Sequence, residues 1–384
     1  MPSDQRIMDH RMSRPKRILF PYVGDSVGGS HISSLTLAQG LPHARYVPVV
    51  AQHQDGPLSQ YLSDRNFSAA FAPNVAFLNT GPYRRQFLKA WVGVPKLVRF
   101  LREHRIDIVH THDIRMHIIW GMAAKRAGIP HIWHQRTPTT AKRLDKYTAH
   151  AAKVLAVSEY CRSKFPPAMQ RRASVLFNPF DIPEPANRPA AQAALLARLG
   201  FAPKTKVIGF IANLDTRKRP LLFVEIAKAL VSQGRDDLRF IMLGEARAPH
   251  IDDLNSAIQS AGLADLVQHI GPQYPIAPWM AGLDLLIAPA VHEALGRTMI
   301  EAQLFATPVV ASNAGGNPEI ILDGQTGLLA TPDAPQAFAD AAIRLLDDPH
   351  FTHTLTSAGK VRAEQTFSAE RHITAMLEIY DSLA

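Results

Sequence analysis

Between Pro289 and Glu301 the chain combines glycine, acidic and basic residues in a pattern that suits an anionic, hydroxyl-rich ligand. An apolar strand predicted over Leu283–Ala288 ends just before this segment, and a helix is expected to begin close to Gly296. A glycine at that point lets a ligand approach the backbone. The N–H groups of Arg297 and Thr298 would then point at a phosphate or sugar oxygen, because the first turn of a helix leaves its donors without intrahelical partners.

Two glutamates flank this predicted helix start. Glu293 lies in the loop before Gly296, and Glu301 falls about one turn into the helix. A carboxylate on such a helix can accept hydrogen bonds from both hydroxyls of a ribose, as the acidic residue of dinucleotide-binding folds does. The alternative is that both glutamates are surface residues of an ordinary αβ unit. The agreement of the glycine, the spacing and the strand favours the ligand site.

Three consecutive cations, Arg217, Lys218 and Arg219, follow the first predicted strand of the second half of the chain. Pro220 comes directly after them and suits the first position of a helix. Such a cluster can neutralise a diphosphate. We expect Lys218 to face the helix start at Gly296 and its two glutamates across one cleft, although a solvated run of charges is the alternative for this segment taken alone.

A glycine-rich turn, Gly24–Ser30, lies between a predicted strand at Arg17–Val23 and a helical run at His31–Leu41. A strand, a glycine turn and a helix N-terminus together bring several free N–H groups to one point. Gly28 and Gly29 are therefore candidate ligand-binding residues. The spacing is not GxGxxG, and a plain tight turn is an equal alternative.

His112 follows the predicted strand Ile106–His110, at the carboxyl end where open α/β sheets bind ligands. A zinc site of His110, His112 and Asp113 is an alternative. On a strand only residues two apart point to the same face, which leaves Asp113 off the face of His110 and His112. No other third ligand is evident nearby in the sequence, so we expect no metal. Arg136 ends the next predicted strand, where it could meet a phosphate or acidic acceptor, or simply act as a cap.

The basic segment from Arg84 to Arg105 has apolar residues at helical spacing around Pro95. It predicts a crossover helix whose apolar face, Trp91 included, packs on the sheet. A helix lying on an anionic membrane leaflet is the alternative.

Short apolar runs alternate with helical patterns along the whole chain, which predicts an α/β fold with parallel sheets. The strands expected in the first half are Arg17–Val23, Tyr46–Ala51, Ile106–His110, His131–His134 and Lys153–Val157. Those expected in the second half are Val207–Ala212, Phe240–Leu243, Val267–Ile270, Leu283–Ala288 and Val309–Ala311. The pattern predicts two Rossmann-like units in tandem, joined by a proline-rich linker.

The expected organisation has five parts. These are a loose tail over residues 1–16, a first domain over 17–180, a linker over 181–203, a second domain over 204–365, and a C-terminal helix over 366–384 that crosses back to the first domain.

Length and charge narrow the function classes. With 384 residues, 46% of them hydrophobic, the chain can build two cores, and the single Cys161 indicates a reducing compartment. Residues 1–180 carry 26 Lys+Arg against 10 Asp+Glu, whereas the remainder carries 16 against 23. A half this basic attracts polyanions, but no recognised nucleic-acid module appears, so we expect no nucleic-acid partner. An anionic acceptor and an anionic membrane surface remain as alternative partners of this basic half.

No stretch approaches the roughly 20 apolar residues needed to span a bilayer, and residues 1–16 lack the apolar core of an export signal. We therefore expect a cytoplasmic protein, with peripheral association with the inner face of the cell membrane as an open alternative.

The segment HEALGRTMIEAQLFATPVVASNAGGNPEIILDGQTGLL has two glutamates separated by seven residues, a helix of small residues and a glycine pair. In this it resembles the retaining glycosyltransferases of family four, and the resemblance extends from about Arg17 to the end. The resemblance implies the GT-B architecture, in which two Rossmann-like domains face each other across a cleft.

By this resemblance, Glu293 lies near the donor sugar, Glu301 holds the ribose, and Lys218 binds the diphosphate. His112 is similar to the histidine beside the reacting sugar, and Gly28 and Gly29 resemble the N-terminal glycine loop. One departure concerns Asn213, which stands where the family usually has a second cation. The candidates for donor binding also include Gly28, Gly29, Asn213, Arg217, Gly296, Arg297 and Thr298, and those for the acceptor are His31, Asp113 and Arg136.

The resemblance implies transfer of a sugar, with retention, from a UDP- or GDP-sugar to a hydroxyl of a glycan or lipid-linked acceptor. Synthesis of a cell-surface polysaccharide or lipopolysaccharide is the expected setting. No cofactor or metal is expected besides the donor. The alternatives are an epimerase of the same architecture and a donor-binding subunit with weak catalysis.

Overall fold

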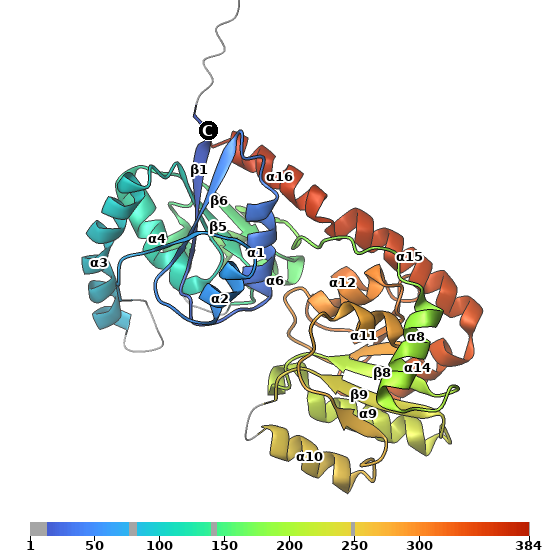
Figure 1. Ribbon diagram of the computed structural model, residues 1–384. Coiled ribbons are helices and arrows are strands. Elements are labelled where there is room, and N and C mark those ends of the chain that lie inside the picture. Colours follow the sequence, from blue (N-terminus) through green and yellow to red (C-terminus); the bar gives the residue numbers. More distant parts are fainter. Residues whose placement is uncertain (1–13, 77–82, 140–143, 247–249, 384) are drawn as a thin grey trace, which may run out of the picture. The chain divides into compact units, whose positions relative to one another are not determined.

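The computed structural model describes residues 14–76, 83–139, 144–246 and 250–383, with side chains of residues 83–90 not described. Within these residues the strands form two parallel sheets, each with helices along its connections (Figure 1). The α/β class and the two Rossmann-like units predicted from the sequence are therefore confirmed.

The first sheet has seven strands in the order β3-β2-β1-β4-β5-β6-β7. They are β1 (Lys16–Tyr22), β2 (Tyr46–Gln52), β3 (Ala69–Phe71), β4 (Ile108–Thr111), β5 (His131–Gln135), β6 (Lys153–Ala156) and β7 (Ala173–Val175). The accompanying helices are α1 (Gly29–Gln39), α2 (Pro57–Ser63), α3 (Tyr83–Glu103), α4 (Ile114–Ala127), α5 (Leu144–Thr148), α6 (Glu159–Ser163) and α7 (Pro167–Gln170).

The second sheet has six strands in the order β10-β9-β8-β11-β12-β13. They are β8 (Lys206–Ile211), β9 (Leu238–Leu243), β10 (Val267–His269), β11 (Leu285–Ala288), β12 (Val309–Ser312) and β13 (Leu328–Ala330). The remaining helices are α8 (Arg188–Leu199), the 3-10 turn η1 (Thr216–Lys218), α9 (Pro220–Ser232), α10 (His250–Ser260), α11 (Ala277–Gly282), α12 (Arg297–Leu304), α13 (Asn317–Ile320), α14 (Pro335–Asp347), α15 (Pro349–Phe367) and α16 (Ala369–Asp381).

Every strand predicted from an apolar run is present, with ends that shift by no more than two residues. Parallel strands are covered on both faces, so they appear in a sequence as continuous apolar runs. Three strands of three residues each, β3, β7 and β13, were not predicted. They lie at or next to sheet edges, and a run that short carries little periodic signal.

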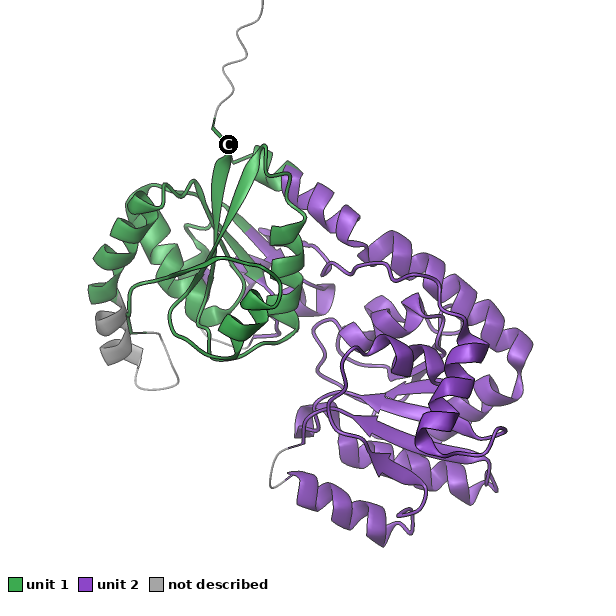
Figure 2. Ribbon diagram, in the orientation of Figure 1, with its two compact units in different colours: residues 1–134, 146–153, 378–384 green, residues 135–145, 154–377 purple. Residues whose placement is uncertain are grey.

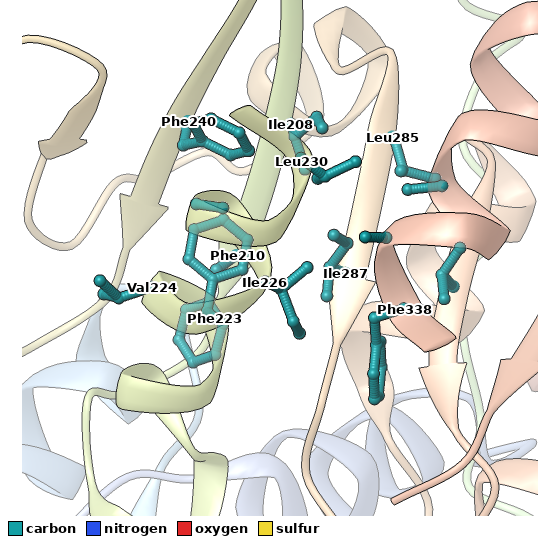
Figure 3. Packing of buried hydrophobic residues seen from close by; sticks show 14 of the residues in the cluster. Ile208, Phe210, Phe223, Val224, Ile226, Leu230, Phe240, Leu285, Ile287 and Phe338 are labelled. Carbon is teal, nitrogen blue, oxygen red and sulfur yellow. The ribbon is translucent and has the colours of Figure 1, made fainter. Parts of the chain in front are cut away.

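The core of the second sheet is a stack of aromatic and branched side chains between the strands and α9 (Figure 3). Phe223 of α9 lies 5.4 Å from Phe210 and 6.1 Å from Phe240, measured between ring centroids. All three rings are almost fully buried. Burial of each such side chain stabilises the fold by roughly 1.5–3 kcal/mol, which gives the loops above this sheet a rigid base.

The basic segment forms helix α3, whose described apolar residues Val94, Leu97 and Leu101 are buried against the first sheet's core. The predicted crossover helix is thereby confirmed. The prediction that Trp91 belongs to the buried face is wrong, because its side chain is 55% exposed. Arg84 and the rest of this helix before Trp91 lie outside the described side chains.

Grouping by contacts divides the chain into two compact units (Figure 2). Unit 1 comprises residues up to 134, 146–153 and 378–384, and unit 2 comprises 135–145 and 154–377. The predicted domain boundaries at 180 and 204 follow the division between the two sheets. They differ from the compact units because residues 135–145 and 154–180, which belong to the predicted first domain, group with unit 2, and because residues 378–384 group with unit 1.

The folded part of the chain starts slightly earlier than predicted. Arg14 pairs with Asp107 at 2.7 Å, and Lys16 begins β1. Residues 1–13 of the predicted tail lie outside the described residues. The predicted linker contains the whole of α8, which packs on α11. Within unit 1, Asp381 at the end of α16 pairs with Arg45 at 2.6 Å.

Candidate active site

Two neighbouring strands of the second sheet, β8 and β11, bring the predicted donor-site loops together. The strand order changes direction between them, and Leu285 of β11 lies opposite Ile208 of β8 in a parallel pair. Open α/β sheets bind ligands outside the carboxyl ends of their strands at such a switch point. The loops that carry Lys218 and Glu293 therefore start side by side, although they are far apart in sequence.

The loop after β8 is a tight turn that fixes the position of Lys218. The carboxylate of Asp215 accepts a hydrogen bond from the Lys218 N–H at 3.1 Å and caps the turn η1. Arg219 follows with φ of 62°, a left-handed conformation that ends η1 and allows α9 to begin at Pro220. The prediction that Pro220 opens a helix is confirmed.

The ammonium group of Lys218 donates to Glu293 Oε1 at 2.5 Å, and Arg217 donates to the same oxygen at 3.1 Å. The Glu293 side chain is 11% exposed, whereas that of Arg217 is 51% exposed. Arg219 instead pairs with Asp333. Two of the three cations therefore converge on one carboxylate, and of the two arginines it is Arg217 that turns toward Glu293.

A small cavity lies between this ion cluster and the start of α12. It is lined by Lys218, Glu293, Gly296 and Thr298, together with the ends of β8 and β11, and its volume is about 20 Å³. That space is close to the size of one water molecule. A diphosphate would therefore have to displace the carboxylate of Glu293 from the two cations, exchanging one anionic partner for another.

Helix α12 begins at Arg297 with Gly296 as its N-cap, as the sequence predicted. The N–H groups of Arg297 and Thr298 lie in the first turn, where no carbonyl one turn back can accept from them. They add the positive end of the helix dipole to the charge of Lys218 and Arg217. A Cβ atom at Gly296 would lie 2.3 Å from Met299 Cε, so this turn is closely packed.

Glu301 lies one turn further along α12, where its carboxylate pairs with Arg297 at 3.4 Å. Burial raises the pKa of Glu301, and Arg297 partly opposes that shift. Glu301 does not line the cavity that Lys218 and Glu293 share. The sequence expectation of a single cavity therefore holds for the helix start and for Lys218, but not for Glu301.

A glycine pair after β12 positions the Glu293 loop. The Gly316 N–H donates to the Glu293 carbonyl at 2.9 Å, and the Asn317 side-chain amide donates to the Ala290 carbonyl at 2.9 Å. A Cβ atom at Gly316 would lie 2.3 Å from the Ala294 carbonyl oxygen. The sequence contains this glycine pair as part of a motif, but its supporting role depends on the tertiary contact with the Glu293 loop.

Asn213 is exposed on the loop after β8, and its carbonyl accepts from the Asp215 N–H at 2.9 Å. Gly244 packs against the same loop, since a Cβ there would lie 1.8 Å from the Ala212 carbonyl oxygen. This close approach was not predictable from the sequence, because the two positions follow different strands, β8 and β9.

On the first sheet the candidate glycine turn also sits at a change of strand order, between β1 and β4. Gly28 is the N-cap of α1, and Gly29 is its first residue. His31 Nδ1 accepts from the Gly28 N–H at 3.2 Å, and burial lowers the pKa of His31. The predicted sequence of strand, glycine turn and helix is confirmed.

The two other acceptor-side candidates have structural contacts. The Asp113 carboxylate caps α4 by accepting from the N–H groups of Arg115 and Met116, at 2.9 and 3.2 Å. Arg136 is buried and donates to the side chain of Asn178. Neither contact was predicted, since capping by Asp113 depends on where α4 begins and Asn178 is remote in sequence.

His112 follows β4 and is only 3% exposed. Its ring lies against Phe20, with centroids 5.7 Å apart, and 4.3 Å from the ring of His110. The ring of His134 is 5.8 Å from that of His112. The expectation that no third metal-ligand residue lies near His110 and His112 is wrong, because β5 brings His134 to the pair.

Comparisons with known proteins agree with this architecture. Residues 205–348 match the family model described as glycosyl transferases group 1, and residues 27–182 match the model described as glycosyltransferase family 4. The chain is 33% identical over 190 residues to the lipopolysaccharide core biosynthesis mannosyltransferase LpsB of Rhizobium meliloti, covering 48% of this chain and 54% of that protein. The chain thus spans about half the length of the first curated relatives it matches.

A longer alignment joins the chain to the D-inositol 3-phosphate glycosyltransferase of Streptomyces griseus, with 26% identity over 76% of this chain and 69% of that protein. Among solved structures, Anabaena Alr3699/HepE in complex with UDP is similar with a TM-score of 0.82 and 22% identity, covering 96% of this chain and all of that one. The lipopolysaccharide outer core galactosyltransferase WaaB has a TM-score of 0.70 at 16% identity, with 96% of this chain and all of that chain covered.

These structural likenesses confirm the predicted GT-B fold. The two family models follow one another along the chain, one on each sheet, and leave residues 1–26, 183–204 and 349–384 unmatched. The chain therefore belongs to the group 1 glycosyltransferases, family 4.

Proposed function

We propose that this protein is a retaining glycosyltransferase that moves a sugar from a nucleoside diphosphate sugar to a hydroxyl of a glycan or lipid-linked acceptor. The observation that carries the proposal is the convergence of Lys218 and Arg217 on Glu293 beside the N-terminus of α12. This arrangement places two cations and a helix start at the carboxyl edge of the sheet, where a diphosphate would be held.

Cleavage of the bond between a sugar and its diphosphate leaves negative charge on the departing oxygens. Lys218, Arg217 and the first N–H groups of α12 would stabilise that charge as it develops, because they are held in place before the reaction starts. Glu293 would then be released from the cations and could accept hydrogen bonds from the donor sugar. Glu301 would hold the two ribose hydroxyls from its position on α12.

Retention follows from attack on the same face as the departing group. The acceptor oxygen forms a bond to the anomeric carbon while the bond from that carbon to the phosphate oxygen breaks, and the acceptor proton passes to the departing phosphate. His112, at the edge of the first sheet, would contact the reacting sugar. Gly28 and Gly29 would contact the donor, and His31 would line the acceptor side. No metal is required at the diphosphate, since Lys218 and Arg217 supply the compensating charge.

The names of similar proteins guide the choice of substrates. LpsB is a mannosyltransferase and WaaB a galactosyltransferase, both of lipopolysaccharide core assembly, and HepE has been solved with UDP and UDP-glucose. We therefore propose a UDP- or GDP-hexose as donor and a growing surface glycan as acceptor.

The experiment is a thermal-shift screen of nucleotide sugars, followed by assays with glycan acceptors. A donor at 100 times its Kd stabilises the fold by about 2.7 kcal/mol, which gives a clear rise in Tm. NMR of the product then reports the configuration at the anomeric carbon. An inverted product contradicts the retaining mechanism, a product formed without acceptor indicates an epimerase, and binding with no turnover against any acceptor indicates a donor-binding subunit.

We also propose a peripheral contact with an anionic membrane surface through α3. Its described outer face exposes Lys96, Arg99 and Arg102, and the Trp91 side chain is exposed one turn earlier. Basic residues near an anionic leaflet contribute about 1 kcal/mol each, and an aromatic ring suits the interface. Among the described residues no helix is long and apolar enough to cross a membrane. Sedimentation with vesicles of phosphatidylglycerol should fall steeply as salt rises.

A further inference from the structure

The end of helix α16 packs within unit 1, although most of that helix groups with unit 2. Residues 378–384 belong to the same compact unit as residues 1–134 (Figure 2). The Tyr380 ring is fully buried, with its centroid 5.5 Å from the ring of Tyr46 and 5.9 Å from the ring of His110. A side chain close to the end of the sequence therefore reaches the histidines that follow from β4.

The Tyr380 hydroxyl begins a chain of hydrogen bonds through two of these histidines. It lies 2.8 Å from His110 Nδ1, and His110 Nε2 lies 3.3 Å from His134 Nδ1. A neutral imidazole has one donor and one acceptor nitrogen, so both contacts of His110 run in the same direction along the chain. An imidazole nitrogen accepts a proton more readily than a phenol oxygen does, which makes the Tyr380 hydroxyl the donor. His110 then donates from Nε2 to His134, which carries its own proton on Nε2.

The His110 ring also forms one wall around His112. The centroids of these two rings are 4.3 Å apart, and Phe20 stacks on His112 at 5.7 Å with 8° between the ring planes. The side chains of His110, His112 and His134 are at most 3% exposed. Because protein interiors are closely packed, a buried ring that loses its hydrogen bond turns only if its neighbours move as well. The hydroxyl of Tyr380 therefore constrains the place of the His112 ring through His110.

We propose that Tyr380 is a positioning residue for sugar transfer, because it sets the tautomers of His110 and His134 and holds the wall against which His112 packs. This inference rests on the proposed function, in which His112 contacts the reacting sugar. A displacement of about 1 Å in a group at the reacting atoms lowers a rate by roughly 100-fold. The end of α16 thus acts on the reaction without contacting the substrate.

Tyr380→Phe tests the proposal, since it removes the hydroxyl and keeps the buried ring. We expect kcat for transfer from the donor identified by the thermal-shift screen to fall by about 10- to 100-fold. KM for that donor should change by less than about twofold, because Lys218 and Arg217 belong to unit 2 and keep their contacts.

Tyr46→Phe is the matched control. The Tyr46 hydroxyl also holds the end of α16, by donating to Asp381, but it is not part of the chain to His110. Arg45 still pairs with Asp381 in this variant. Its kcat should therefore stay within about twofold of that of the unmodified protein.

NMR of protein labelled with ¹⁵N-histidine reads the tautomers without any turnover. In the unmodified protein His110 and His134 should each carry their proton on Nε2. In Tyr380→Phe the ring signals of both His110 and His112 should move, whereas Tyr46→Phe should leave those of His112 in place. Replacement of each of the three histidines by glutamine assigns the signals.

Three results overturn the positioning role of Tyr380. They are a proton on His110 Nδ1 in the unmodified protein, a normal kcat in Tyr380→Phe, and an equal loss of kcat in Tyr46→Phe, which would indicate only poorer docking of α16. The first of these decides even if Tyr380→Phe does not fold. Absence of transfer by the unmodified protein is instead a failure of the proposed function, and the His112 signals of Tyr380→Phe then decide whether the hydroxyl holds that ring.

Discussion

Replacement of Lys218 by methionine is the sharpest test of the donor site. Lys218→Met keeps the length of the side chain but removes the ammonium group that lies 2.5 Å from Glu293. Arg217 still contacts the same carboxylate oxygen at 3.1 Å, so Glu293 retains one cationic partner and the fold should survive. The turn that carries Lys218 is held by backbone contacts to Asp215, which the substitution leaves in place.

The expected effect is on the rate of sugar transfer. Loss of one preorganised contact to a developing negative charge raises a barrier by about 3 kcal/mol, which corresponds to roughly a 100-fold lower kcat. The effect should appear in kcat more than in KM, because the charge on the leaving diphosphate is greater in the transition state than in the bound donor. The assay is release of nucleoside diphosphate from a donor identified by the thermal-shift screen.

Arg219→Met is the matched control. Arg219 is the next residue and carries the same charge, but it pairs with Asp333 away from the cavity. Its loss should change kcat less than threefold, since a partly exposed ion pair contributes little to stability or to a site it does not face. The reasoning is refuted if both variants are equally impaired, or if Lys218→Met transfers sugar at the normal rate.

Three other predictions concern single groups. Glu301→Gln should raise Tm at neutral pH, because burial raises the pKa of Glu301 and thus makes its ionised form costly in the folded state. This gain in Tm should vanish as pH falls below about 4.5, where the Glu301 carboxyl is protonated in both the folded and the unfolded state. The same substitution should lower donor affinity. Measurements of Tm and of donor binding against pH check both effects. Burial lowers the pKa of His131 to about 3. The free energy of unfolding should therefore be highest above pH 6.5, where the ring is neutral in both states, and should decline as the pH falls from 6.5 towards 3. The slope contributed by this one group is at most about 1.4 kcal/mol per pH unit. Chemical unfolding across that range tests it, and His131→Gln should flatten the decline. Gly316→Ala would place a Cβ 2.3 Å from the Ala294 carbonyl oxygen and should displace the Glu293 loop, lowering transfer at least tenfold. Gly316 has a φ of −86°, which alanine adopts freely, so the effect would come from the close approach and not from the backbone angle; transfer at the normal rate would contradict it.

The local structure of the donor site was predictable from the sequence. The start of α12 at Gly296 and of α9 at Pro220 followed from a glycine after an apolar strand and a proline after a charged turn. Both signals act within a few residues, where backbone sterics and unsatisfied helix donors dominate the choice of conformation. The division of the three cations was not predictable, because Arg219 turns toward Asp333, a residue more than 100 positions away.

The histidines near β4 are a second case in which a contact between residues remote in sequence was not predictable. His110 and His112 were recognised as a pair on one strand face, and zinc was set aside for want of a third ligand. A third histidine, His134, stands in a different strand, and only the register of β4 and β5 makes it a neighbour. The exposure of Trp91 is a similar case, since helical spacing identifies a stripe of apolar residues but not where that stripe leaves the core.

The amino-acid sequence by itself determined the α/β class, the tandem of two parallel-sheet units, the ends of the main strands and helices, and the family. These depend on short-range periodicity and on motifs within one loop and one helix, which the chain encodes locally. The tertiary structure alone decided that Lys218 and Arg217 meet Glu293, that Glu301 lies outside their cavity, and that three histidines share one sheet face. Such contacts depend on strand order and register, which arise from the packing of the whole sheet and leave no local trace in the sequence.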